Sequence, residues 1–64
     1  MFIHSKFKRN EKVVNLDRVA KIYSAEMKSK NQWAIFFQFD ELFFEVWYYD
    51  NEKDMKKELE EIFS

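Results

Sequence analysis

WAIFFQFDELFFEVWYY, residues 33–49, is the stretch that decides the fold. Apolar side chains alternate along both halves of it, and the polar pair Asp40-Glu41 separates the halves. Alternation with a period of two is typical of a half-buried strand, so we predict a β-hairpin over Trp33–Tyr49. A turn at Asp40-Glu41 sets Phe37 opposite Phe44 and makes every cross-strand pair on one face apolar. That face carries Trp33, Ile35, Phe37, Phe39, Leu42, Phe44, Val46 and Tyr48.

A helix is predicted after the hairpin, over about Asn51–Phe63. Met55, Leu59 and Ile62 fall on one helical stripe, and Asn51 or the residue before it can cap the first turn. A narrow apolar stripe must lie on an apolar surface, and the Trp33–Phe39 face supplies one.

The first half of the chain allows two interpretations. Apolar residues between positions 16 and 28 follow helical spacing, which favours a helix there. Alternatively, Val13–Leu16 ends a first hairpin, the chain kinks at Asp17-Arg18, and Val19–Ser24 begins a third strand. The β-branched residues in this region favour the strand.

The segment Val14–Ile22 reads V-N-L-D-R-V-A-K-I. It resembles the pattern V-N-L-D-x-V-x-x-I of small bacterial and phage β-meander-plus-helix proteins, and is similar to that of a flagellar-motility accessory family. The likeness in element order extends from Phe2 to Phe63. It implies an antiparallel meander closed by a C-terminal helix, with a strand over Val19–Ser24, and it carries over no functional residue.

The chain is therefore predicted to be a single α+β domain over residues 1–64. Its architecture is a small antiparallel β-meander with a C-terminal α-helix packed on one face, and a helix over 16–28 is the alternative. The longest apolar run is only five residues, and the N-terminus lacks the apolar stretch of a secretion signal, so we expect a cytoplasmic protein.

Composition excludes several classes of enzyme. The chain has no glycine and no cysteine, so it has no P-loop, no dinucleotide fingerprint and no thiolate metal site. Its one histidine, His4, excludes the usual two-histidine zinc motifs. Ser5 follows His4 directly, and neighbouring strand residues point to opposite faces, so the two are poorly placed as a catalytic pair. We predict no catalytic residue, metal or cofactor.

The second face of the hairpin indicates a binding function. One helix covers only one face of a sheet, and aromatic side chains alternate onto the other face. We predict a non-enzymatic interaction module that binds itself, as a homodimer, or another protein. By analogy in size and composition, it is expected to be a phage or mobile-element accessory protein. The predicted partner-binding residues are Phe36, Phe43, Glu45, Trp47 and Tyr49.

Single-stranded nucleic acid is the alternative partner, because the charge is split along the chain. Residues 1–30 hold eight bases and three acids, a net of +5, whereas residues 31–64 hold three bases and nine acids, a net of −6. Bases beside an aromatic sheet can bind phosphate while the rings stack on nucleobases. Glu45 opposes this interpretation by repelling phosphate. The bases that would serve are Lys6, Lys8, Arg9 and Lys12.

Overall fold

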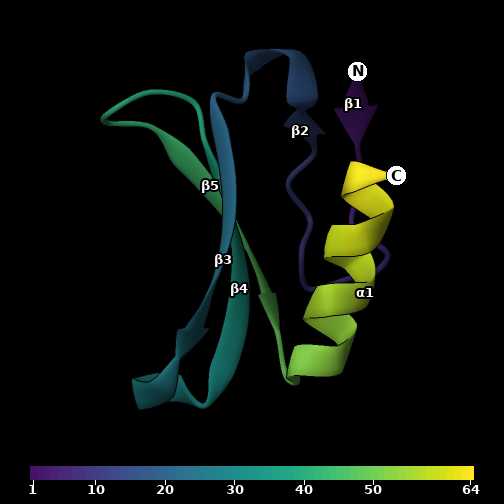
Figure 1. Ribbon diagram of the computed structural model, residues 1–64, viewed down its shortest axis with the longest axis vertical. Coiled ribbons are helices and arrows are strands. Elements are labelled where there is room, and N and C mark those ends of the chain that lie inside the picture. Colours follow the sequence, from purple (N-terminus) through teal and green to yellow (C-terminus); the bar gives the residue numbers. More distant parts are fainter.

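A three-stranded antiparallel sheet forms the centre of the computed structural model, which describes all 64 residues. The sheet has the order β3-β4-β5, and a short antiparallel ribbon of β1 and β2 stands apart from it. Helix α1 and the ribbon lie on the same side of the sheet (Figure 1). No helix is long and apolar enough to cross a membrane. The elements are β1 (Phe2–Ile3), β2 (Val14–Asn15), the 3₁₀ turn η1 (Leu16–Arg18), β3 (Lys21–Met27), the 3₁₀ turn η2 (Lys28–Lys30), β4 (Gln32–Gln38), β5 (Phe44–Tyr49) and α1 (Glu52–Phe63).

The predicted α+β meander with a C-terminal helix is confirmed. Helix α1 begins where expected, because the side chain of Asn51 accepts a hydrogen bond of 2.8 Å from the backbone N–H of Asp54. The strand interpretation of the first half is also correct, since β3 pairs with β4 along its whole length, but the strand starts at Lys21 instead of Val19 and continues to Met27. A helix over 16–28 is wrong: only the single turn η1 forms there, at the predicted kink.

The pairing of β4 with β5 differs by one residue from the prediction. Phe37 lies opposite Glu45, not opposite Phe44. The cause is the loop over 39–43, whose five residues replace the expected two-residue turn. The Asp40 carboxylate accepts hydrogen bonds of 2.8 and 2.9 Å from the backbone N–H groups of Leu42 and Phe43, which organises the loop. An odd number of loop residues exchanges the two faces of β5.

The shift of register changes which aromatic residues of β5 enter the core. Trp47 and Tyr49 were predicted to face away from α1, but they are buried on the side that α1 covers. The ring of Trp47 packs edge-on against Phe37, with centroids 4.8 Å apart, and its Nε1–H donates to the Lys12 carbonyl. The buried core consists of Val14, Ile35, Phe37, Trp47, Tyr49 and Met55.

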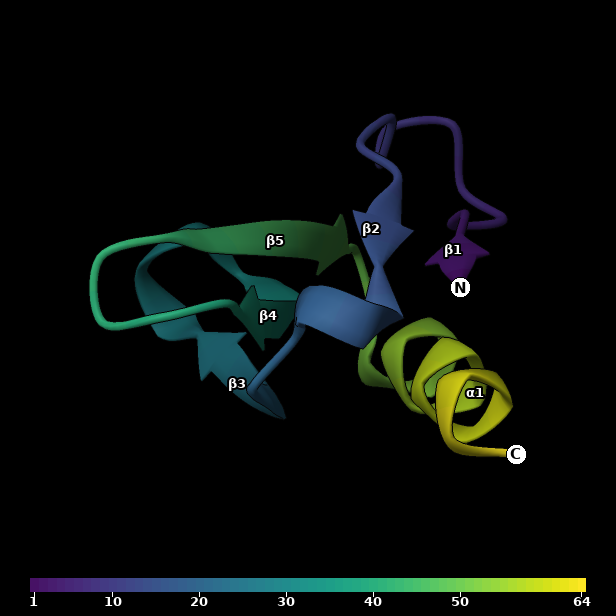
Figure 2. The ribbon, with the colours of Figure 1, turned by 90° about the horizontal axis from the view of Figure 1, so that it is seen from above.

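The long connection from β1 to β2 covers the outer side of β5 near its C-terminal end. The buried side-chain amide of Asn10 pairs with both backbone groups of Tyr48, as a neighbouring strand would. Its Oδ1 accepts from the Tyr48 N–H at 2.8 Å, and its Nδ2 donates to the Tyr48 carbonyl at 3.0 Å. Figure 2 shows this connection and α1 beyond one end of β5, with the β4–β5 loop projecting from the other end. β5 is therefore protected locally, whereas β3 is a free edge.

Candidate functional site: the open face of the sheet

The face of the sheet opposite α1 is covered by no other element (Figure 1). The strand registers place alternate residues of all three strands on this face. Eight of these eleven residues are apolar, and they adjoin one another across the strands. We call these residues the open-face patch: Tyr23, Ala25 and Met27 of β3, Ala34 and Phe36 of β4, and Phe44, Val46 and Tyr48 of β5.

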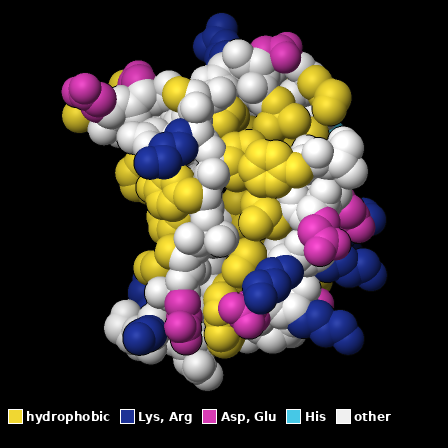
Figure 3. Space-filling model, in the orientation of Figure 1, with side chains coloured by type: hydrophobic (Ala, Val, Ile, Leu, Met, Phe, Trp, Pro, Cys, Tyr) yellow, Lys and Arg dark blue, Asp and Glu magenta, His cyan; other side chains and the backbone are white.

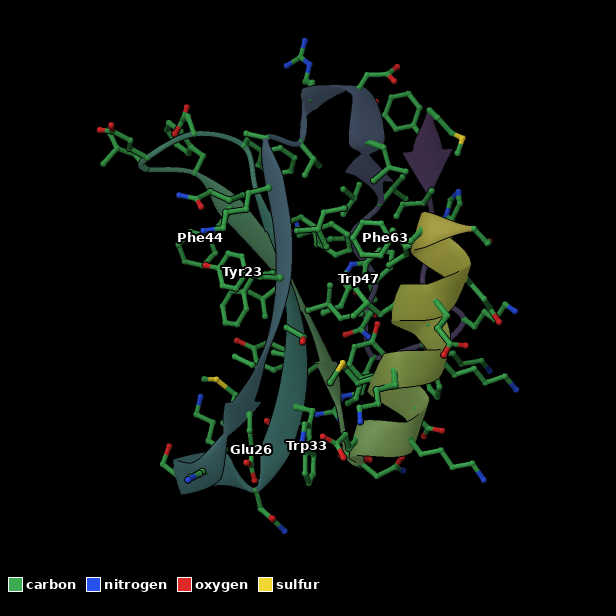
Figure 4. The ribbon with its side chains drawn as sticks, viewed as in Figure 1. Tyr23, Glu26, Trp33, Phe44, Trp47 and Phe63 are labelled. Carbon is green, nitrogen blue, oxygen red and sulfur yellow. The ribbon has the colours of Figure 1, made fainter.

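A row of three aromatic rings crosses the patch from β3 to β5. Tyr23 and Phe36 stack in parallel, with centroids 5.0 Å apart and an interplanar angle of 8°, and Phe44 follows at 6.2 Å from Phe36. Figure 4 shows Tyr23 and Phe44 on the side of the sheet away from α1, whereas Trp47 points toward the helix. The stacking holds the rings in place before any partner binds, which lowers the entropy cost of binding.

Much of this row is accessible to solvent. Tyr23 is 39% exposed and Phe44 is 56% exposed. The whole chain exposes 4946 Å², whereas a monomeric protein of 8.0 kDa exposes about 4,450 Å². The chain thus exposes about 500 Å² more than that, to which the open face and several exposed apolar side chains elsewhere both contribute. Large exposed apolar patches of this kind mark interaction sites in small proteins.

Charge is nearly absent from the open-face patch. Lys21 is the one charged strand residue on this face, and it lies at one end with its Nζ 5.4 Å from the centroid of the Tyr23 ring. Gln32 and Gln38 complete the polar rim. An apolar centre with a polar rim is the usual composition of a protein–protein interface.

The structure separates the five residues predicted to bind a partner. Phe36 lies at the centre of the open-face patch. Phe43 and Glu45 lie on the other side of the hairpin, where they line a cleft beside the β1–β2 ribbon. Trp47 and Tyr49 are core residues, as described above. The prediction missed Tyr23, Phe44 and Tyr48 as residues of this face. If the prediction had assumed a loop with an odd number of residues after Gln38, it would have placed Phe44 and Tyr48 on the same face as Phe36.

The four bases of the nucleic-acid alternative lie in the β1–β2 connection and not on the open face. Two of them are already paired with acids: Lys6 Nζ lies 2.7 Å from Glu61, and Arg9 forms an ion pair with Asp50. The remaining two, Lys8 and Lys12, are exposed and have no acidic partner. These bases are not brought together with the aromatic row.

A buried carboxylate is the strongest polar feature on the α1 side. Glu58 Oε1 accepts from the Tyr49 hydroxyl at 2.5 Å and from Ser5 Oγ at 2.6 Å, and Oε2 accepts from the Lys6 backbone N–H at 2.9 Å. Burial, and then the neighbouring carboxylate of Glu58, raise the pKa of the Tyr49 phenol far above its ordinary value. Both oxygens of Glu58 are occupied, so the cluster links the N-terminal segment to α1 and β5.

No group of three or more His, Cys, Asp or Glu side chains is arranged to hold a metal ion. Comparison of the chain with protein-family models, with curated proteins and with solved structures found no match.

Proposed function

We propose that the protein is a small interaction module whose open-face patch associates with the same patch of a second copy. The observation that carries this proposal is the stacked aromatic row on a sheet face that no other element covers. The partner is a protein surface, because the centre of the patch is apolar and almost free of charge.

Area supports a dimer of modest affinity. Three strands about 4.8 Å apart and about seven residues long give a face of roughly 14 by 22 Å, or about 300 Å² before side-chain relief is counted. The relief of the side chains and the residues at the rim raise the area that each copy buries to about 500 Å². Two copies together then bury about 1,000 Å², which is the lower limit for a specific interface. We expect a Kd of about 1–100 μM.

Charge favours a second copy as the partner. The formal net charge of the chain is −1, so two copies meet with little mutual repulsion. In a two-fold arrangement, the single Lys21 of each copy lies at the rim and no charge is buried at the centre. A cytoplasmic location and a role as a phage or mobile-element accessory protein remain predictions from the sequence.

Sedimentation velocity from about 10 μM to 1 mM tests the proposal, a range that brackets the expected Kd. We expect the mass to rise from 8.0 kDa toward twice that value. Phe44→Lys, which places a charge in the patch, should keep the protein monomeric. Leu42→Lys is the matched control, because Leu42 is 81% exposed but lies in the β4–β5 loop outside the patch. A monomeric wild type over the whole range, or equal association of both variants, would contradict the proposal.

The alternative function, binding of single-stranded nucleic acid, is tested with the same variants. Titration of labelled single-stranded DNA into the protein at low and high salt should give no salt-dependent binding. Salt-dependent binding that Phe44→Lys strengthens and a Lys8→Glu change abolishes would support the alternative instead.

A further inference from the structure

Strand β3 lacks a partner on its outer side, and an apolar groove adjoins its N-terminal end, between the η1 region and the C-terminal end of α1. The sheet ends at β3, and α1 packs against β4 and β5 but makes few contacts with β3. Figure 3 shows the exposed β3 backbone in white, with hydrophobic surface on either side of it. The surface on the α1 side forms a groove of about 360 Å³, and its apolar lining consists of Leu16, Val19, Ala20, Ile22, Ile62 and Phe63.

The shape of this site matches an extended chain. An edge strand directs alternate N–H and C=O groups outward, where another strand can pair with them. A chain that pairs with β3 also directs every second side chain to the α1 side of the sheet, and the one that lies beside Ile22 enters the groove. The groove offers it partly buried Ile22 as floor and the ring of Phe63, which is 66% exposed, as one wall.

The charges around β3 indicate an acidic occupant. Lys21 lies at one end of the strand, and Lys28 and Lys30 lie in η2 at the other end. Arg18 lies in η1, just before β3. None of these four bases takes part in an ion pair within the chain. Glu26 is the one acid between positions 18 and 30, so this region carries a net charge of +3.

We infer that β3 and the adjoining groove bind an extended acidic segment of a partner protein as a fourth strand of the sheet. The segment has apolar side chains at alternate positions on the α1 side of β3, of which the one beside Ile22 enters the groove, and acidic side chains at its ends, which meet the lysines. Glu26, exposed on the groove face of β3, restricts pairing with arbitrary strands, because charges on an edge strand oppose indiscriminate association. This site uses the outer edge and the α1 side of β3, whereas the open-face patch uses the side chains on the opposite side of the same strand.

A seven-residue capped peptide, acetyl-Glu-Val-Ser-Ile-Ser-Val-Glu-amide, is a direct probe. We expect it to shift the backbone amide resonances of β3, with a Kd of about 0.1–1 mM. Two N-methylated forms separate strand pairing from simple apolar contact: methylation of alternate residues in one phase should weaken binding at least tenfold, and in the other phase it should leave the affinity unchanged. A version with Lys in place of both Glu residues should bind at least threefold more weakly at low salt.

Variants of the protein complete the test. Phe63→Ser should weaken peptide binding severalfold, whereas Phe44→Ser, at a similarly exposed ring on the open face, should leave it unchanged even where it abolishes the dimer. No shifts in β3 at about 5 mM peptide, equal effects of both methylation phases, or equal binding of the lysine peptide would overturn the inference. So would shifts of the β3 amides with protein concentration alone in Phe44→Ser, because they would show that β3 pairs with a second copy.

Discussion

Replacement of Glu58 by alanine is expected to bring the domain close to unfolding. The carboxylate accepts three hydrogen bonds, from the Tyr49 hydroxyl at 2.5 Å, from Ser5 Oγ at 2.6 Å and from the Lys6 N–H at 2.9 Å. In Glu58→Ala these donors lose their acceptor in a part-buried or buried setting. Each such loss costs about 1.5–3 kcal/mol when the missing partner is charged.

The three losses are not additive, because the three donors share one carboxylate. The part-buried donors of the N-terminal segment can also form hydrogen bonds with water instead. We therefore expect a total of about 3–5 kcal/mol. A 64-residue domain has about 3–10 kcal/mol of stability in all. The melting temperature should fall by about 12–40 °C, since each kcal/mol corresponds to about 4–8 °C in a domain of this size. Thermal unfolding followed by circular dichroism measures it.

Glu61→Ala is the matched control on the same helix. Glu61 pairs with Lys6 Nζ at 2.7 Å, but the Lys6 side chain is largely exposed and that of Glu61 is still accessible to solvent, so the pair contributes at most about 1 kcal/mol. A shift of the melting temperature by less than about 5 °C in Glu58→Ala, or equal shifts in both variants, would refute the assignment of Glu58 as the link between the N-terminal segment and α1.

Two further predictions concern Tyr49 and Asn10, which lie on the α1 side of the sheet and at the outer edge of β5. Because the folded state raises the pKa of Tyr49, the proton of its phenol stabilises the fold fully below the ordinary tyrosine pKa of about 10, and this contribution is lost as the pH rises above that value. Urea unfolding of the wild type should therefore show falling stability above about pH 10, and Tyr49→Phe should show a smaller fall; equal slopes would contradict the assignment. Asn10→Ala should remove the protection of the Tyr48 amide against hydrogen exchange and cost about 1–3 kcal/mol, because Asn10 is the partner of that N–H; unchanged protection would show that another group covers it.

Local patterns were enough to predict α1 and the β4–β5 hairpin, whereas they left helix and strand both open over residues 16–28. The stripe of Met55, Leu59 and Ile62 and the cap at Asn51 located α1 to within a residue, because helix propensity and capping are set by neighbours in the sequence. The buried face of β4, with Ile35 and Phe37 inward, also followed from alternation alone.

The faces of β5 could not be assigned in the same way. Almost every position from Leu42 to Tyr49 is apolar, so alternation fits either phase, and the loop length decides between them. The five-residue loop is organised by hydrogen bonds to the Asp40 side chain and contains no residue with positive φ, which a tight two-residue turn would require. One residue of error moved Trp47 and Tyr49 from the predicted binding face into the core.

The contacts of the N-terminal segment could not be predicted from the sequence, for a different reason. Ser5, Asn10 and Glu58 are separated by up to 53 positions, and no local pattern marks them as partners. Hydrogen bonds between distant segments depend on the final packing and not on propensity. A glutamate at position 58 within an otherwise charged helix is indistinguishable from a solvent-exposed residue until the fold is known.

Isotope-filtered nuclear Overhauser spectroscopy on a mixture of ¹³C-labelled and unlabelled protein tests the central claim most directly. It detects only contacts between different copies of the chain. If the open-face patch is the dimer surface, cross-peaks should connect the rings of Tyr23, Phe36 and Phe44 in one copy with patch residues of the other, and Phe44→Lys should remove them. A spectrum without such cross-peaks at about 1 mM, or one with cross-peaks confined to the outer edge of β3, would contradict the account.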